Sequence, residues 1–402
     1  MSRFPNSEAT RSRCLTLLSD EEQKLRLKKL RDAMARNCIS YGLISGNTSK
    51  YYLTGRVFLG YILVTLDSMT CYVRRPVELE GPDVVYIRKP EEIKAPAGKM
   101  ALELDELSYS GALRLSAVFG EEYPLNLSPA LMEARSVKTD FEIEMLRYSG
   151  RRQAEVYNRI PSLYKPGMSD IDLQIEIERE SRREGCLGQF RISGDSMELF
   201  MGNVLAGDNA DSPSPFDFAM GGAGLDPSVP VGADNTKIEP GMAVMVDVNG
   251  NYNGYMTDMT RIYSAGPLDE KALEAHRCSI AIHRRLQAMG KPGVKASEMY
   301  EAAAEEASKA GLADYFMGHR QKAGFVGHGV GIEINERPVL APRSRDILQL
   351  RNVIAIEPKF VIPGVGAVGN EDTYVVREDG LERITLCDEA ITDLYAVHPH
   401  YI

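Results

Sequence analysis

In the first third of the chain, the pattern of hydrophobic and polar positions first predicts one helix and then mostly short strands. Ser19–Glu22 has the capping-box pattern, and Leu25, Leu30 and Met34 follow it as candidates for the buried face of a helix. Short β-rich runs bounded by Gly, Asp and Pro come next, at Tyr41–Ser45, Tyr61–Leu66, Cys71–Val73 and Val84–Ile87. Two helical patterns, 111–119 and 129–135, complete a predicted α/β unit over residues 19–135, and residues 1–18 are predicted to form an irregular arm.

The remaining pattern predicts a second, larger α/β (α+β) domain over residues 136–402. Its expected helices are Val137–Arg147, Ile171–Glu184, Asp269–Met289 and Ala296–Ala310, the third closed by Gly290 and the fourth by Gly311. Two β-rich stretches lie among them, Val246–Arg261 and a pair of strands over Asn352–Val376 around a Pro-Gly turn.

Residues 186–242 are rich in Gly, Ser, Pro and Asp and show no regular period. Long segments of this composition inside a compact domain are usually lids or binding loops. We expect this segment to form a wall of the functional site, and the alternative is a disordered surface insertion.

Composition excludes some classes of function. The chain has 402 residues, 44% of them hydrophobic, and a net charge of −10, so it can bury large cores but does not favour a nucleic-acid surface. Its six cysteines contain no C-x-x-C pair, which is typical of reduced thiols. With no signal peptide and no apolar run of membrane-spanning length, we expect a cytoplasmic protein that binds neither nucleic acid nor membrane.

Candidate chemistry begins in Val246–Arg261. Asp247 and Asp258 lie on two β-rich runs joined by the Asn/Gly turn Gly250–Gly254. Alternation along a strand places Asp258 and Thr260 on one face, so the two carboxylates can converge across the hairpin. Taken alone, both aspartates would more often be turn residues.

Three further candidates follow nearer the end of the chain. His328 lies in the glycine-rich frame Gly327–Gly331, Glu357 precedes a proline, and Glu371 begins the sequence Glu-Asp-Thr. Taken alone, His328 could be a loop histidine without a ligand role, and Glu357 could lie at an exposed strand end. Together with the two aspartates they provide four carboxylates and one imidazole, ligands enough for two divalent ions that share bridging oxygens.

The order and spacing of these residues resemble the pita-bread metallopeptidases: methionine aminopeptidase, Xaa-Pro aminopeptidase, prolidase and their relative creatinase. The family pattern D-x-G, G-Y-x-x-D-x-T-R, G-H-G-x-G, E-P and E-D-T is matched except at Asn249, where glycine is usual. Tyr51–Arg56 is similar to the Y-L-T-G segment of the creatinase-like N-terminal domain, and Val137–Arg147 to the first helix of the catalytic domain. The resemblance implies a pita-bread catalytic domain preceded by a smaller creatinase-like domain.

It also implies roles for the residues that match. The metal ligands would be Asp247, Asp258, His328, Glu357 and Glu371. Two of these, Asp258 and Glu371, would bridge two divalent ions that hold a hydroxide, with Thr260 supporting a bridging carboxylate. Glu357 would also carry a proton to the leaving nitrogen, and His328 would complete the catalytic set. The oxygen-rich shell favours manganese, with cobalt, iron or zinc as alternatives, and relatives are usually homodimers.

Two departures from the proline peptidases concern their histidines. Asn335 stands where those enzymes have the histidine of H-E-x-P, and the chain has no histidine before His276. Asn335 can donate a hydrogen bond to a substrate oxygen but cannot carry a proton at neutral pH. We therefore assign it a catalytic role as a neutral donor to the substrate carbonyl.

The other histidines have weaker signals. His276 and His283 share a helix face, where packing is the expected role and a metal pair the alternative. His319 is nine residues before His328 and could assist near the metals.

Three functions are compatible with this sequence. The first is a metal-dependent exopeptidase that hydrolyses Xaa-Pro bonds, of dipeptidase or aminopeptidase type. The second is a hydrolase or lyase of small molecules on the same fold, because a change of substrate would remove peptide-binding histidines. The third is a non-catalytic binding protein, although such proteins usually lose metal ligands. A dipeptidase needs a cation for the substrate carboxylate, and Arg337 and Arg343 are the nearest in sequence.

Overall fold

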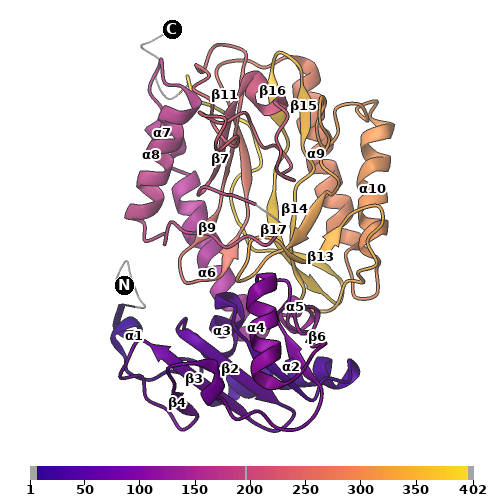
Figure 1. The fold of residues 1–402 in the computed structure, drawn as a ribbon. Helices are drawn as coiled ribbons and strands as arrows, with labels where there is room; N and C mark the ends of the chain where they lie inside the picture. The colour runs from indigo at the N-terminus through magenta and orange to yellow at the C-terminus, as the bar shows by residue number, and fades with distance from the viewer. Residues whose placement is uncertain (1–6, 195–196, 397–402) are drawn as a thin grey trace. The chain divides into compact units, whose positions relative to one another are not determined.

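The computed structural model describes residues 7–194 and 197–396. By their internal contacts these residues form two compact units, Met1–Thr139 and Asp140–Ile402. The ribbon of each unit is mixed helix and strand, as the predicted α/β class requires (Figure 1).

The first unit is built on a mixed six-stranded sheet with the order β4-β3-β2-β1-β5-β6. Its strands are β1 Tyr41–Ile44, β2 Leu59–Thr65, β3 Met69–Arg75, β4 Val84–Tyr86, β5 Met100–Leu102 and β6 Leu125–Asn126. Its helices are α1 Ser7–Arg11, α2 Asp20–Arg36, α3 Asn47–Thr54, α4 Tyr109–Phe119 and α5 Ser128–Ser136, with a 3-10 turn η1 at Pro90–Glu92. The predicted cap of the first long helix is confirmed, since the Ser19 side chain accepts a hydrogen bond from the backbone N–H of Glu22.

The prediction of an irregular N-terminal arm is wrong at residues 7–11, which form α1. This five-residue helix is too short to be stable alone. Tertiary contact supports it, because the Arg56 guanidinium donates to the backbone oxygens of Ala9 and Ser12 at 3.0 Å each. Residues 1–6 of the predicted arm lie outside the described residues.

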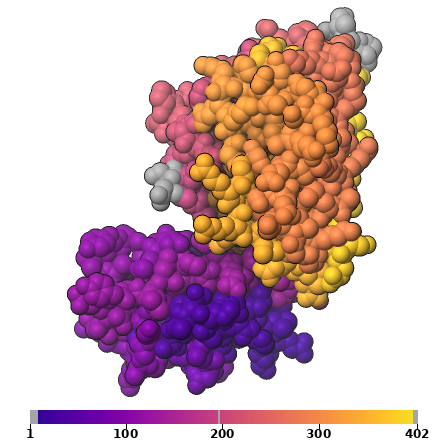
Figure 2. All heavy atoms as spheres, turned by 90° about the vertical axis from the view of Figure 1, so that its right-hand side faces the viewer, coloured from indigo at the N-terminus to yellow at the C-terminus, as the bar shows by residue number. Residues whose placement is uncertain are grey.

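The second unit surrounds its sheets with two groups of helices (Figure 1). The helices are α6 Asp140–Tyr157, α7 Ile160–Leu163, α8 Asp170–Arg183, α9 Glu270–Met289 and α10 Ala296–Lys309, with a 3-10 turn η2 at Gly207–Asp211. Their apolar faces are buried against the strands, and α9 and α10, in the orange part of the chain, form much of the surface drawn in Figure 2. The predicted end of α9 at Gly290 is confirmed.

In the described part of this unit, the strands form two larger sheets and two short hairpins. A four-stranded sheet has the order β19-β11-β8-β7, and a five-stranded sheet has the order β13-β12-β14-β17-β18. The strands are β7 Gly202–Ala206, β8 Ala243–Val248, β9 Gly250–Asn251, β10 Met256–Thr257, β11 Thr260–Ser264, β12 Gly327–Gly329, β13 Glu336–Leu340, β14 Val353–Ile356, β15 Phe360–Ile362, β16 Gly366–Val368, β17 Asp372–Arg377, β18 Gly380–Arg383 and β19 Thr392–Asp393. The predicted aspartate hairpin is present as the antiparallel pair β8 and β11.

Sequence reasoning missed two features of these sheets. Residues 186–242 contain β7, which pairs with β8, and the Gly residues at both of its ends hid this strand. Four strands occupy Asn352–Val376, where two were expected. The chain leaves the five-stranded sheet after β14, forms the separate hairpin β15–β16, and rejoins the sheet at β17. Proline at position 358 has no N–H for a ladder and accounts for the first break. Among the described residues, no helix combines the length and apolar character needed to cross a membrane.

Candidate metal centre

Strand pairing brings the five predicted ligands together in the second unit. Asp247 lies on β8 opposite Thr260 of β11, and Thr260 in turn forms a bridge with Glu371. His328, on β12, lies opposite Ala355 of β14, immediately before the end of that strand. Glu357 follows β14 directly, and Asp258 lies in the break between β10 and β11 rather than on a strand. The register of both sheets therefore fixes which carboxylates meet.

The ligand atoms form two groups that share Glu371. One group contains Asp258, His328 and Glu371, and the other contains Asp247, Glu357 and Glu371. Within each group the side-chain ligand atoms lie within 4.8 Å of one another. Each of the five predicted ligands thus belongs to a group whose side chains can approach a cation.

Two buried carboxylate oxygens in this centre have no hydrogen-bond donor among the described residues: Oδ1 of Asp258 and Oε1 of Glu371. A buried ionised oxygen without a partner is costly, because it has lost its water and gained nothing in return. A bound cation would satisfy both oxygens. This part of the centre therefore fits a metal ion, as the family pattern requires of these two residues.

The imidazole of His328 completes the same group. Its Nδ1 lies 3.2 Å from the backbone oxygen of Gly329, which leaves Nε2 to face the acids. Nε2 lies 3.4 Å from Oε1 of Glu357 and 3.8 Å from Oδ2 of Asp258. A hydrogen bond from Nδ1 to a backbone oxygen is a common way to orient a metal-binding histidine.

Electrostatics in the centre reflect the crowding of buried carboxylates. Burial and the neighbouring acids raise the pKa of Asp258 well above its usual range and raise that of Glu371 to about 8. Burial also opposes ionisation of Glu357, but Lys359 and His328 together lower its pKa to about 2. Of these three acids, Glu357 is the one held most firmly in its ionised form.

Side-chain hydroxyls hold Glu371 and Asp258, the two residues with unpartnered carboxylate oxygens. Thr260 donates to Oε2 of Glu371 at 2.8 Å, as expected for the residue that supports a bridging carboxylate. The Thr373 hydroxyl accepts from the backbone N–H of Asp258 at 2.9 Å and donates to its backbone oxygen at 2.8 Å. Asp258, although outside the strands, is therefore held on both sides of its backbone.

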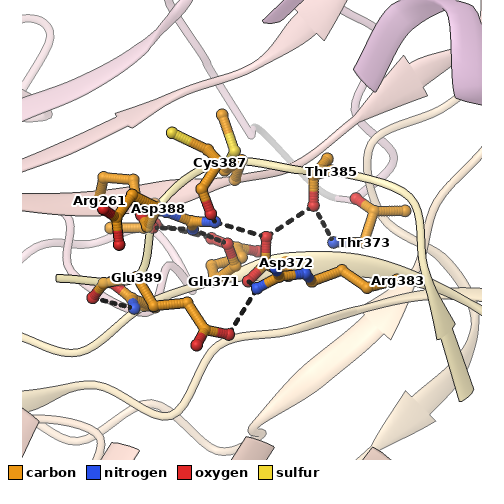
Figure 3. A network of polar contacts seen from close by, with 12 residues as sticks. Arg261, Glu371, Asp372, Thr373, Arg383, Thr385, Cys387, Asp388 and Glu389 are labelled. Carbon is orange, nitrogen blue, oxygen red and sulfur yellow. Dashed lines mark hydrogen bonds and ion pairs between the residues drawn. The ribbon is translucent and has the colours of Figure 1, made fainter. Parts of the chain in front are cut away.

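A buried ion pair lies behind Glu371 (Figure 3). The guanidinium of Arg261 contacts the carboxylate of Asp372 at 2.8 Å and donates to the backbone oxygen of Glu371 at 2.8 Å. Two further carbonyls, those of Asp388 and Cys387, accept from the same guanidinium at 2.6 and 3.1 Å. Both charged side chains are almost fully buried, so the pair has no water to replace a lost partner.

Lys359 also belongs to the centre, and sequence reasoning missed it. Its fully buried Nζ donates to Asp247 at 2.7 Å, Glu357 at 2.8 Å and Glu371 at 3.2 Å. Burial alone would lower its pKa, yet these three carboxylates hold the pKa well above its usual value. The available signal was its position two residues after Glu357, since alternate residues of extended chain point to one side.

The centre opens into a pocket with largely apolar walls. Its apolar lining is formed by Ile192, Met197, Leu199, Phe218, Met220, Phe325 and Ile334. Most of these residues come from the 186–242 segment, so that segment forms one wall of the pocket. The ionisable side chains of the described lining are acids and His328, and it includes neither lysine nor arginine.

Asn335 lines the pocket, but its amide is engaged with the wall segment. Its Oδ1 accepts from the backbone N–H of Ser193 at 2.8 Å, and its Nδ2 donates to the Ser193 oxygen at 2.6 Å. This paired contact resembles a short strand pairing and holds the wall segment against β13. The amide group has a second N–H, so contact with a substrate carbonyl remains a prediction.

The remaining candidates lie away from the pocket lining. His276 and His283 pack in the interior, where their ring nitrogens contact the backbone oxygens of Glu389 and Asn370, respectively. His319 lies 3.0 Å from Asp211. Arg337 pairs with Asp346, and Arg343 does not line the described pocket.

Comparison with known proteins gives the class of this protein. Residues 144–378 match the model of metallopeptidase family M24, and residues 26–137 match that of the creatinase/prolidase N-terminal domain. The Xaa-Pro dipeptidase of Pyrococcus furiosus is 30% identical over 381 residues, 90% of this chain and 98% of that protein. Because the first match spans more than half of the chain, this protein belongs to metallopeptidase family M24.

Solved structures agree with this assignment. An Xaa-Pro dipeptidase from Bacillus anthracis aligns with a TM-score of 0.76 at 24% identity, over 92% of this chain and 99% of its own. A prolidase from Pyrococcus furiosus aligns with a TM-score of 0.70 at 26% identity, over 89% and 99%. The predicted architecture, a creatinase-like domain followed by a pita-bread domain, is confirmed, and the protein is a hydrolase of the metallopeptidase type.

A first prediction concerns the two acids with unpartnered oxygens. We expect an Asp258→Ala, Glu371→Ala double variant to lose essentially all of its bound divalent metal, because both groups of ligands lose a member. Elemental analysis of desalted protein measures this directly. The matched control is Asp379→Ala, Glu378→Ala, which changes two exposed acids of the same unit. Full metal content in the first double variant would exclude this site.

Proposed function

We propose that this protein is a metal-dependent exopeptidase that hydrolyses Xaa-Pro peptide bonds. The observation that carries the proposal is the convergence of all five family-position ligands, with buried oxygens of Asp258 and Glu371 that lack a partner. The Xaa-Pro specificity of the dipeptidase and prolidase relatives supports the choice of substrate. Manganese is the proposed metal, because the ligand set is rich in oxygen. The predicted cytoplasmic location and homodimeric state belong to the same proposal.

A divalent ion at this site supplies a Lewis acid that polarises a carbonyl and lowers the pKa of a water molecule. The chain's own contribution begins with Glu357, whose carboxylate lines the pocket and can accept a proton from a water molecule there. It can pass that proton to the leaving nitrogen, which must be protonated before the peptide fragment departs. The apolar pocket wall holds the substrate side chains and excludes water from the reacting bond.

The pocket favours aminopeptidase action over dipeptidase action. A dipeptidase must bind a free carboxylate next to the scissile bond, which requires a cation. The described lining offers acids, Asp217 among them, and no lysine or arginine. Such a lining suits a substrate's free amine better than its free carboxylate.

A second candidate function is hydrolysis or lysis of a small molecule other than a peptide. The observation in its favour is the amide at position 335, where the proline peptidases have histidine. That amide already bonds Ser193 through both its oxygen and its nitrogen. In an enzyme that does not bind peptides, position 335 would not need a histidine for the substrate, and its side chain could instead hold the pocket wall at Ser193.

Substrate tests separate these functions. With manganese present, we expect cleavage of Xaa-Pro peptides, and we expect Xaa-Pro amide, which lacks a free carboxylate, to have a kcat/KM at least equal to that of the Xaa-Pro dipeptide. N-acetylated Xaa-Pro should be a poor substrate, because its amine is blocked. Absence of cleavage with manganese, cobalt, iron and zinc would favour the small-molecule function. A strict requirement for the carboxylate would contradict the aminopeptidase assignment.

The role of Glu357 gives a second kinetic prediction. Glu357→Gln preserves a carbonyl oxygen but cannot accept the proton, so kcat on the best substrate should fall by roughly 10²–10⁴-fold. Metal content is measured in parallel, so that loss of proton transfer is distinguished from loss of metal. Glu378→Gln, which changes an exposed acid, serves as the control. A kcat within about twofold of the parent would show that Glu357 carries no proton.

Asn335 gives a third. If its amide also donates to the substrate carbonyl, Asn335→Ala should cost about 1–3 kcal/mol of transition-state stabilisation, measured as the fall in kcat/KM. The parent should show no ionisation from this position, whereas Asn335→His should introduce a limb near pH ~6.5 in the pH–rate profile. An unchanged profile in Asn335→His would mean that position 335 supports only the wall segment.

A further inference from the structure

The position of Lys359 follows from the fold around it. Its backbone oxygen accepts from the N–H of Met317 at 2.8 Å, and the next residue, Phe360, packs its ring 5.4 Å from that of Phe316. On the other side, Gly369 approaches so closely that a Cβ there would lie 3.0 Å from the Lys359 Cα and 2.3 Å from the backbone oxygen of Pro358. The lysine backbone is therefore fixed, and its side chain extends inward.

The ammonium group at the end of this side chain is fully satisfied. An ammonium has three N–H donors, and Nζ has three carboxylate acceptors within 3.2 Å. All three acceptors belong to buried or largely buried side chains. If the ammonium lost its contacts with these carboxylates, it would be a buried charge without a partner, which is strongly unfavourable.

The three acceptors are also the three members of one ligand group, Asp247, Glu357 and Glu371. The ammonium thus sits among the same carboxylates that a second metal ion would need. Two cations competing for the same oxygens repel each other strongly in a buried site. Among the described residues, no ammonium contacts Asp258 or His328 of the other group, which contains both of the unpartnered carboxylate oxygens.

Charge balance agrees with this division. Four ionised acids carry four negative charges, and one divalent ion with one ammonium supplies three positive charges. Before any hydroxide is counted, a second divalent ion added to the ammonium would leave the buried centre with one net positive charge. On the same count, a single ion with the ammonium leaves it with one negative charge.

We propose that the Lys359 ammonium takes the place of one metal ion, so that this protein binds a single divalent ion, held by Asp258, His328 and Glu371. The lysine then acts as a fixed cation that positions Asp247 and Glu357. The inference refines the metal site of the proposed function and replaces the two ions expected from the family resemblance. It concerns binding alone, so it can be tested without any substrate.

The test is a metal count on the full chain. Protein stripped with a chelator is titrated with manganese, and the bound ion is measured by elemental analysis after desalting and by calorimetry. We expect about one ion per chain for the parent. The electron paramagnetic resonance signal of the bound Mn²⁺ should be that of an isolated ion, without coupling to a second. Two ions per chain, or none, would overturn the proposal.

Variants locate the ion. Asp247→Asn should keep about one ion, because Asp247 contacts the lysine, whereas Asp258→Asn should lose it. Equal loss in both variants would contradict the assignment of the two groups. Lys359→Ala should gain a second ion and a coupled Mn²⁺ signal, and Lys165→Ala, at an exposed lysine, should behave as the parent does. If Lys359→Ala does not fold, the number of ions bound by the parent and the comparison of Asp247→Asn with Asp258→Asn still test the proposal.

A negative substrate test would leave this inference intact. Failure to cleave Xaa-Pro peptides while one ion is bound would contradict the proposed substrate alone. Two bound ions with full Xaa-Pro activity would contradict only the role of Lys359.

Discussion

Mutual repulsion among buried carboxylates is the constraint on which the second unit depends. Four acids approach one another in a region from which water is largely excluded, and such a group is stable only if cations or donors compensate it. The fold supplies a part of the compensation itself, through Lys359, His328 and the hydroxyl of Thr260. It leaves two oxygens for a ligand from outside. The site is therefore partly neutralised by the protein before any metal binds.

The surrounding structure keeps these charges from separating. Asp258 is bracketed by Thr373, and Glu371 is held by Thr260 and by the buried guanidinium of Arg261. Breaking a buried pair such as Arg261–Asp372 typically costs about 3–5 kcal/mol. Such supports allow the acids to remain in place against their own repulsion, which is what a preorganised metal site requires.

Much of this arrangement could be read from the sequence, because the information is local. Helix caps at Ser19 and Gly290 and the hairpin that carries Asp247 follow from patterns within a few residues. The four acids and the imidazole were recognisable from their frames. What could not be read depends on long-range contact: β7 is a strand because it pairs with β8, and α1 is a helix because Arg56 supports its end. Lys359 was missed for the same reason, since only the fold shows that its side chain ends among three carboxylates.

Two of the carbonyls that accept from Arg261 come from a segment that follows all five predicted metal ligands in the sequence (Figure 3). The backbone oxygens of Cys387 and Asp388 accept from Arg261, and that of Glu389 accepts from the amide of Asn370, the neighbour of Glu371. During synthesis, all five predicted metal ligands emerge from the ribosome before this segment does. Until it follows, Arg261 has donors without acceptors and the backbone beside Glu371 lacks one of its supports. The centre can reach its final geometry only after Cys387–Glu389 has folded back against Arg261 and Asn370, so ordered assembly of the site waits for a segment that is made after all of its ligands.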